Sequence, residues 1–264
     1  MGYAARLLRL LRSLAMTAAT HPTIGTLTMR LRYFLFSFAL LGLLGFSWPF
    51  SFLFSQPNHE SFGTSSWLQK QMQIVKSQAG NLNDQVLRLS LLAFMHARQQ
   101  GVVTKPLLTV IDYSKPSTEK RLWVFDLNRG KMLFNTWVSH GKNSGGVNAT
   151  SFSNQPGSLK SSMGVFVTDD TPYMGGNGYS LRIKGLEHGI NDKAYQRDIV
   201  FHGAWYVDPA VGRRYGQIGR SWGCPAVSEN TIKPLIETIR NHSVVFMYYP
   251  DQHWLRHSHF LASV

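Results

Sequence analysis

The sequence predicts a mainly β domain with flanking helices, preceded by a transmembrane helix. Three observations lead to this prediction. Runs of apolar and β-branched residues recur from residue 107 onwards, separated by Gly- and Ser-rich loops. Residues 61–100, before these strands, have apolar residues at helical spacing. Another predicted helix, at residues 228–241, follows all the strands except the last. A long stretch without acidic or basic residues lies near the N-terminus.

The N-terminal segment has the pattern of a membrane anchor. Residues 1–32 contain arginines and no acidic residue, and no Asp, Glu, Lys or Arg stands between Arg32 and Glu60. An apolar run of this length can cross a bilayer, which needs about 20 residues, and arginines before it place the N-terminus in the cytoplasm. We therefore expect a basic cytoplasmic N-terminus at residues 1–32 and a transmembrane signal anchor at residues 33–55, with the rest exported.

Two alternatives stay open for this segment. Residues 33–55 can be a cleaved signal peptide, although the bulky exit SFLFSQPNH lacks the small residues of a cleavage site. Met29 begins MRLRYFLFSF, which alone has the layout of an export signal, so translation can start there. Otherwise residues 1–28 form a basic surface helix.

Residues 56–104 are predicted to be a helical spacer with helices over 61–80 and 82–100. In the second helix Leu87, Leu91 and Phe94 recur at intervals of three and four, which indicates a packed face. Gly101 follows it as a usual C-terminal signal.

Residues 105–250 are predicted to hold most of the β structure. A hairpin turn is expected at residues 128–130, and a helix over 228–241 begins at Ser228, Asn230 or Thr231. Residues 251–264 form a C-terminal tail in which nothing stands out. The expected strands are 107–113, 121–127, 131–138, 164–169, 179–186, 198–203 and 243–249.

One cysteine, Cys224, stands in the segment GRSWGCPAV between a glycine and a proline. A single cysteine in an exported chain forms no internal disulfide, so it is an intermolecular partner, a reactive thiol or a buried small apolar residue. Gly223 and Pro225 argue against the interior of a strand or helix. We therefore favour the reactive thiol.

His202 is the predicted base for this thiol, because it ends the predicted strand DIVFHG shortly before Cys224. An imidazole within hydrogen-bond reach ionises a thiol and later returns the proton to a leaving amine. The N–H groups of Gly223 and Cys224 are candidates for an oxyanion hole. Ser221 is expected to hydrogen-bond either within the turn or to the histidine.

Other residue patterns argue against a metal or a nucleic-acid partner. No H-E-x-x-H motif or cysteine pair is present, and the short spacing His257-x-His259 lies in the tail, so we expect no metal and no cofactor. His140 and His188 precede glycines in loops, and His140 can line the cleft. The formal net charge of +13 favours anionic partners without naming them, and no nucleic-acid motif accompanies it.

The sequence resembles a known family. The pattern HG followed by S-x-G-C resembles the signature of the L,D-transpeptidase (YkuD-type) catalytic domain, in its divergent murein branch. The blocks LLTVIDYSKPSTEKRLWVFDL, HGKNSGG, FSNQPGSLKSSMGVF, GYSLRIKGLEHGIN, FHGAWYV and GRSWGCPAV extend the resemblance over about residues 105–250.

The resemblance implies a mixed β-sandwich or barrel in which the cysteine loop leads into a helix. It also implies that Cys224 is the nucleophile, that His202 is the base and that the carbonyl of Gly203 is the third member. The serine of the family motif falls on Ser221, and the glycine before its cysteine falls on Gly223. Gly164, in SSMGVF, matches a strand that lines the donor side.

Two residues depart from the family pattern. Trp222 replaces the usual histidine before Gly-Cys, and Ala226 replaces a polar residue after the cysteine. The second change puts in doubt how substrate is oriented, and Arg220 is a candidate substitute.

The reaction implied is attack of the thiol on a tetrapeptide stem of peptidoglycan, followed by transfer to an acceptor amine to form 3–3 cross-links. The implied partners are stem peptides and, through the N-terminal segment, the inner membrane. The catalytic domain is expected in the periplasm, anchored or secreted. An L,D-carboxypeptidase or other hydrolase on the same scaffold and a non-catalytic wall-binding module are the alternatives.

Overall fold

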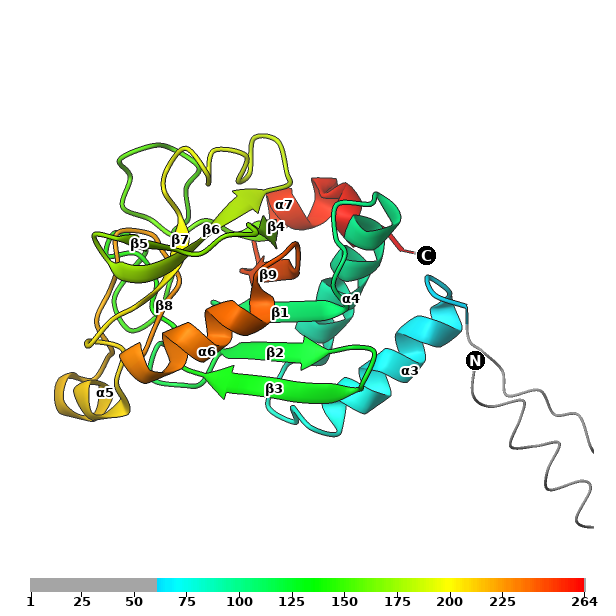
Figure 1. Ribbon diagram of the computed structural model, residues 1–264, viewed down its shortest axis with the longest axis horizontal. Helices are drawn as coiled ribbons and strands as arrows, with labels where there is room; N and C mark the ends of the chain where they lie inside the picture. Colours follow the sequence, from blue (N-terminus) through cyan, green and yellow to red (C-terminus); the bar gives the residue numbers. More distant parts are fainter. Residues whose placement is uncertain (1–60, 264) are drawn as a thin grey trace, which may run out of the picture. The chain divides into compact units, whose positions relative to one another are not determined.

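The computed structural model describes residues 61–263 (Figure 1). The predicted cytoplasmic segment, the anchor at residues 33–55 and the alternative start at Met29 lie outside these residues. Within residues 61–263, no helix combines the length and the apolar character that a membrane span requires.

The described residues form one mixed sheet of nine strands, in the order β3-β2-β1-β9-β4-β6-β7-β8 with β5 paired to β6. Neighbours are antiparallel except β1 with β9 and β7 with β8, which are parallel. The prediction of a mainly β fold with flanking helices is confirmed. The strands are β1 Leu107–Asp112, β2 Leu122–Asp126, β3 Lys131–Thr136, β4 Gly164–Thr168, β5 Tyr173–Gly175, β6 Gly178–Gly185, β7 Val200–Gly203, β8 Ala226–Val227 and β9 Val244–Tyr248.

The central strands are apolar on both faces because each face is covered. Every residue of β1, β2, β4 and β9 is buried. Val110 and Phe246 pack with residues of α4 in one cluster, whereas Ile111 and Val245 pack with residues of α6 in another. Strands buried on both sides appear in sequence as continuous apolar runs, which is why they were predictable.

Two helices precede the sheet and share its core. α3 (Ser65–Lys76) and α4 (Asp84–Gln99) begin where Thr64 and Asn83 cap the free backbone N–H groups with their side chains. Leu87 and Leu91 of α4 are fully buried against the sheet. The segment predicted as a spacer therefore shares one hydrophobic core with the strands from α3 onwards.

The C-terminal residues, in which the sequence showed nothing distinctive, also contribute to this core. They form α7 (Gln252–His257) and a short 3-10 helix, His259–Leu261. The Trp254 side chain is fully buried, and its Nε1–H donates to both carboxylate oxygens of Glu187 at 2.9 and 3.1 Å. This segment is therefore fastened to the core through a buried carboxylate.

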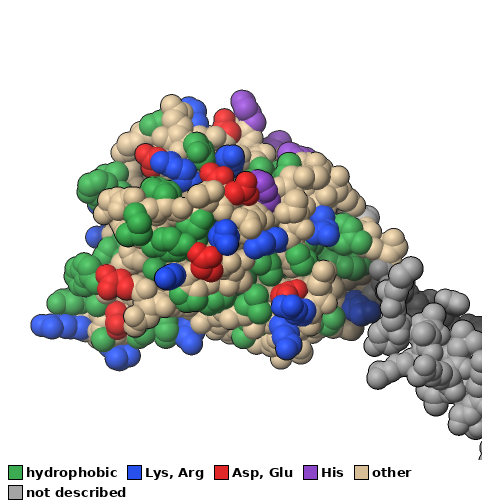
Figure 2. All heavy atoms as spheres, viewed as in Figure 1, with side chains coloured by type: hydrophobic (Ala, Val, Ile, Leu, Met, Phe, Trp, Pro, Cys, Tyr) green, Lys and Arg blue, Asp and Glu red, His purple; other side chains and the backbone are tan. Residues whose placement is uncertain are grey.

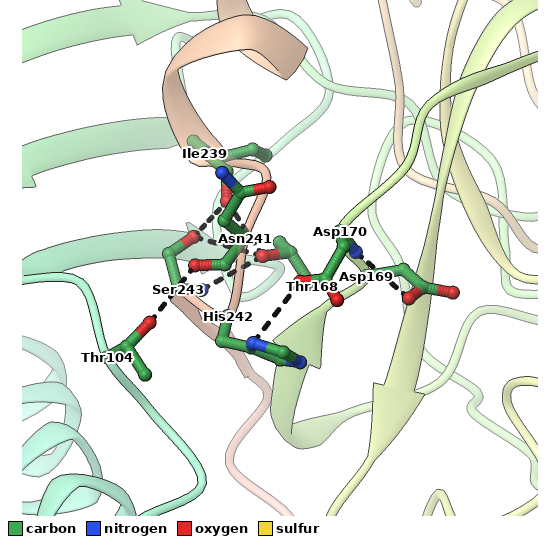
Figure 3. Close-up of polar contacts among 8 residues, drawn as sticks. All are labelled: Thr104, Thr168, Asp169, Asp170, Ile239, Asn241, His242 and Ser243. Atoms are coloured by element: carbon green, nitrogen blue, oxygen red, sulfur yellow. Dashed lines mark hydrogen bonds and ion pairs between the residues drawn. The ribbon is translucent and has the colours of Figure 1, made fainter.

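A tight turn leads from α6 (Glu229–Ile239) into β9 and fixes the helix against the sheet (Figure 3). Asn241 and His242 adopt positive φ values of 69° and 56° there. Thr168 at the end of β4 holds the turn, because its hydroxyl donates to the carbonyl of Ile239 at 2.7 Å and accepts from the N–H of Ser243 at 2.9 Å.

Besides the C-terminal helices, three short elements were not predicted from the sequence: β5, β8 and α5 (Pro209–Tyr215). α5 lies between His202 and Cys224 in the sequence. It begins with a proline at its first position, and the side chain of the preceding Asp208 caps it by accepting from the N–H of Ala210. Figure 2 shows that Lys and Arg on this face are scattered among Asp and Glu rather than gathered into one patch. This face therefore lacks the basic stripe that nucleic-acid-binding proteins present.

Candidate active site

Cys224 lies in the turn that leads into β8 and then α6, as the resemblance implied. β7 runs parallel to β8, with His202 opposite Ala226 in the register. Cys224 stands two residues before Ala226, so it lies level with the start of β7. Thiol and imidazole therefore come from adjacent segments of the sheet edge.

The thiol is buried and hydrogen-bonded to the backbone. Cys224 is 8% exposed, and its Sγ donates to the carbonyl oxygen of Asp198 at 3.4 Å. Burial raises the thiol pKa, and the Asp198 charge acts in the same direction. A hydrogen bond from the Val200 backbone and the Arg197 charge lower it. The hydrogen bond of the sulfur thus goes to the backbone of Asp198. The role of His202 as the base for this thiol remains a prediction.

His202 is held as a neutral imidazole with one ring nitrogen left to act as a base. Its Nδ1 lies 2.9 Å from the carbonyl oxygen of Gly203, which can only accept, so Nδ1 carries the proton and Nε2 carries the lone pair. Burial lowers the pKa of His202, which is 5% exposed. The contact with the Gly203 carbonyl is the one that the resemblance implied.

Ser221 organises the turn that carries the thiol. Its Oγ donates to the carbonyl oxygen of Cys224 at 2.6 Å and accepts from the N–H of Gly223 at 3.1 Å. Of the two roles expected for Ser221, the structure shows the one within the turn. The Gly223 N–H was predicted as an oxyanion-hole donor, and this was wrong because Ser221 already occupies it. Among residues 61–263 the Cys224 N–H meets no protein acceptor.

Glycine is required at position 223 for two reasons. Its φ of +127° disfavours any side chain, and a Cβ there would lie 2.8 Å from the carbonyl oxygen of Lys160. Gly164 also has a positive φ, of 110°, and a Cβ there would collide with the side chains of Glu187 and Asn191. Packing accounts for the glycine at 164, and its place along the substrate remains a prediction.

His140 supports the turn from behind instead of lining a cleft. Its side chain is fully buried, its Nδ1 accepts from Nη2 of Arg121 at 2.8 Å, and its carbonyl accepts from the N–H of Ser221 at 3.0 Å. Burial and the Arg121 charge lower the pKa of His140 to about 4. The expectation that His140 can line the cleft is therefore wrong.

Arg220 and Trp222 lie on the outside of the same turn. Arg220 donates from Nη1 to the carbonyls of Lys142 and Gly145 at 3.1 and 2.8 Å, which ties the two loops together. The Trp222 ring is 74% exposed, with the Lys142 ammonium 5.9 Å from its centroid. A role for either side chain in substrate binding remains a prediction.

Arg197 and Asp198 are the site residues that sequence reasoning missed. Asp198 adopts a φ of 52°, a left-handed conformation that aspartate tolerates better than most residues, and its carbonyl accepts the thiol hydrogen. Arg197 contacts residues 153–162, more than thirty positions away. Neither contact has a local sequence signal.

The described residues contain no group of three or more His, Cys, Asp or Glu that could hold a metal ion. Two cavities in this part of the chain lie away from the thiol. One is lined by Thr118, Trp137, Pro209, Gly212, Arg213 and Ile218. The other is lined by Lys76, residues 80–84, Asp112, Ser114 and Lys115.

Comparison with known proteins decides the family. Residues 78–248 match the family model of the L,D-transpeptidase catalytic domain. The chain belongs to this family. A search of curated proteins finds no significant match.

Solved structures with similarity to this L,D-transpeptidase family member include two that share little sequence with it. "L,D-transpeptidase from Mycobacterium smegmatis" is 14% identical, with a TM-score of 0.34, 55% of this chain covered and 59% of that one. "Structure of the Ldtfm-avibactam carbamoyl enzyme" is 12% identical, with a TM-score of 0.33, and coverages of 56% and 51%. The chain thus spans little more than half of either solved chain. Because both TM-scores are low, the family assignment rests on the sequence match.

Proposed function

We propose that the protein is a peptidoglycan L,D-transpeptidase that works through a cysteine acyl-enzyme. The family match supports the reaction class, and the observation that carries the proposal is the neutral His202 imidazole held beside the segment that bears the only cysteine. A thiol becomes a nucleophile when a nearby base takes its proton.

In the first step, Nε2 of His202 takes the thiol proton and Sγ of Cys224 attacks the carbonyl carbon at the L-centre of meso-diaminopimelate in a tetrapeptide stem. The C–S bond forms as the C–N bond to D-alanine breaks. The imidazolium gives its proton to the leaving amine. The Cys224 N–H, which has no protein acceptor among the described residues, is the remaining candidate donor for the developing oxyanion.

In the second step, an amine of a neighbouring stem attacks the thioester. Its nitrogen loses a proton to His202, the C–S bond breaks, and the proton returns to the sulfur. The product is a 3–3 cross-link, and the enzyme is regenerated.

The reaction needs a more open site than the one described. Cys224 is 8% exposed and its hydrogen bond points to Asp198, so the sulfur must leave that carbonyl before it can meet a substrate and His202. The turn itself is held by Ser221 and does not have to change. A rotation of the Cys224 side chain, with displacement of the loop that covers it, is the smallest movement that suffices.

The proposed substrate places the catalytic domain in the cell envelope, because peptidoglycan lies outside the inner membrane. A membrane anchor in the N-terminal segment, or secretion to the periplasm, fits this location. We propose stem peptides and the inner membrane as the partners.

The test is to incubate the purified full-length chain with disaccharide-tetrapeptide and to identify the products by mass spectrometry. We expect free D-alanine and a cross-linked dimer. Cys224→Ala and His202→Ala should abolish both, whereas His188→Ala, a matched exposed histidine also followed by glycine, should retain them.

The products also separate the alternatives. Tripeptide monomers without dimers would show a hydrolase in place of a transpeptidase. Binding of peptidoglycan without any product, unaffected by Cys224→Ala, would show a wall-binding module and refute the acyl-enzyme.

A further inference from the structure

We propose that Arg197 is a positioning residue for the reaction. It clasps residues 153–162 over the Cys224 turn and sets a positive charge beside the thiol without a carboxylate partner of its own. The inference rests on the proposed role of Cys224 as the nucleophile and assigns a further residue to that site.

The clasp consists of four hydrogen bonds from one guanidinium. Nη1 donates to the carbonyl of Ser153 at 2.5 Å and to the hydroxyl of Ser162 at 2.6 Å. Nη2 donates to the hydroxyl of Ser158 at 3.2 Å and to the carbonyl of Lys160 at 2.7 Å. These bonds fold both ends of the segment onto Arg197. A lysine ammonium cannot reproduce this planar fork.

The clasped segment lies directly on the turn that carries the thiol. A Cβ placed on Gly223 would be 2.8 Å from the Lys160 carbonyl oxygen and 3.5 Å from Nη2 of Arg197. Ser161 also donates from its hydroxyl to the carbonyl of Gly223 at 3.4 Å. Arg197 and its segment therefore cover the residue next to Cys224, which helps explain the low exposure of the thiol.

Arg197 is a partly buried cation without a matching anion. No carboxylate in residues 61–263 lies within ion-pair distance of its guanidinium. The adjacent Asp198 carboxylate pairs with Arg182 instead. Nη2 of Arg197 lies 3.5 Å from the point that a Cβ on Gly223 would occupy, next to Cys224. When the thiol ionises, its thiolate is therefore the anion that Arg197 can balance, and each charge acts on the pKa of the other group.

The remaining titratable groups around the thiol do not supply a positive charge. Tyr113 and Tyr206 interact with Cys224, but burial raises the pKa of each to about 12, so both are neutral. His202 is neutral as well, because burial lowers its pKa. The Asp198 carboxylate adds a negative charge that opposes ionisation of the thiol, whereas a hydrogen bond from the Val200 backbone favours it. Arg197 is thus the cation that acts with the Val200 backbone against the cost of ionising a buried thiol.

The experiment measures alkylation of Cys224 by iodoacetamide in the full-length chain from pH 6 to pH 10. The label is unambiguous because the chain has one cysteine. The midpoint of the rate profile reports the ionisation of the thiol, and the plateau at high pH reports its accessibility. The readout requires no turnover, so it tests the placement of Arg197 at the thiol separately. Absence of transpeptidation with normal labelling profiles would count against the proposed function, whereas unchanged profiles in the Arg197 variants would count against this inference alone.

We expect Arg197→Gln to move the midpoint up by about one unit, and so to slow labelling about 10-fold at neutral pH, since a neighbouring opposite charge shifts a pKa by about 1–3 units. Arg197→Lys should keep the midpoint near that of the wild type while raising the plateau, because the charge stays and the clasp opens. Arg129→Gln, which removes the same charge from an exposed surface residue, should behave as the wild type.

A second variant separates the clasp from the charge and does not depend on the folding of Arg197→Gln. Ser158→Ala with Ser162→Ala removes two clasp bonds and keeps the guanidinium, so it should raise the plateau and leave the midpoint in place. An unchanged midpoint in Arg197→Gln would overturn the proposal. So would an equal midpoint shift in the serine double variant, or an absence of labelling in every variant.

Discussion

The hydroxyl of Ser221 donates to the carbonyl oxygen of Cys224 at 2.6 Å and accepts from the N–H of Gly223 at 3.1 Å. One side chain thus satisfies two backbone groups on either side of the proposed nucleophile. Because the turn is buried, these groups have no water to replace the hydroxyl. The direction in which the thiol leaves the backbone depends on this pair of bonds.

Ser221→Ala should therefore lower both stability and activity. Leaving a buried donor or acceptor without a partner costs about 1–3 kcal/mol, so we expect a loss of that order in the free energy of unfolding. Transpeptidation should fall further than stability alone explains. Ser221→Thr keeps the hydroxyl and should restore most of both, measured by chemical denaturation and product formation. Equal activity in the alanine and threonine variants would contradict this account.

Gly223→Ala should disturb the turn more than an ordinary glycine substitution does. Its φ is +127°, and the Lys160 carbonyl oxygen lies 2.8 Å from the point that a Cβ would occupy, so there is no room for a methyl group. We expect a lower melting temperature and a loss of acyl-enzyme, detected as a mass adduct on Cys224. Gly176→Ala is the matched control, because a Cβ there has no neighbour within 4 Å. Equal behaviour of the two variants would refute the proposed constraint.

The central strands were predictable from the sequence because β1, β4 and β9 are buried on both faces and read as unbroken apolar runs. The two residues of β8 carry no such pattern, and they pair only because the turn at Cys224 brings them beside β7. Trp254 looked like an ordinary tail residue because its partner, Glu187, lies far away in sequence. The structure around β8 and Trp254 thus depends on contacts between residues far apart in sequence, which a local pattern does not show.

In the candidate site, too, residues within the motif were predictable, whereas residues brought in by distant parts of the chain were not. The contact of His202 with the Gly203 carbonyl and the turn role of Ser221 were expected from the motif, and the structure has both. The catalytic roles of Cys224 and His202 remain predictions. The motif also assigned the Gly223 N–H to the oxyanion, because sequence does not reveal which way an N–H points. The position of Arg197 depends on residues 153–162 folding back onto it, so no local pattern could reveal it.

His140 should make the stability of the protein depend on pH. Its folded pKa of about 4 lies below the ordinary value of 6.5, so the folded state binds a proton less readily than the unfolded state. The contribution of His140 to the free energy of unfolding is then fully present above pH 6.5. It is lost as the pH drops towards 4, which lowers that free energy by about 3 kcal/mol.

Substitution separates this contribution from other titrations. His140→Gln can still accept from Arg121 but cannot take up the proton, so it should lose less stability than the wild type between pH 6.5 and pH 4. His188→Gln, at an exposed position, should follow the wild type in urea unfolding at each pH. If all three proteins lose the same free energy over this range, His140 does not carry the dependence.

The contact between Trp254 and Glu187 yields a prediction for the C-terminal segment. The Nε1–H of Trp254 donates to a carboxylate whose pKa burial already raises, so the ionised form depends on its donors. Trp254→Phe keeps most of the buried ring and removes the donor, which should cost about 1–3 kcal/mol of unfolding free energy.

The loss of unfolding free energy in Trp254→Phe should also depend on pH, because the Glu187 carboxylate titrates. A raised folded pKa means that this group's contribution is present at low pH and is lost as the pH rises through that pKa. Removing a donor raises the pKa further, so Trp254→Phe should cost more at pH 7 than at pH 4. Trp205→Phe makes the same change at an indole that is 72% exposed, and it should cost little at either pH. A loss in Trp254→Phe that is equal at both pH values would mean that it comes from packing alone.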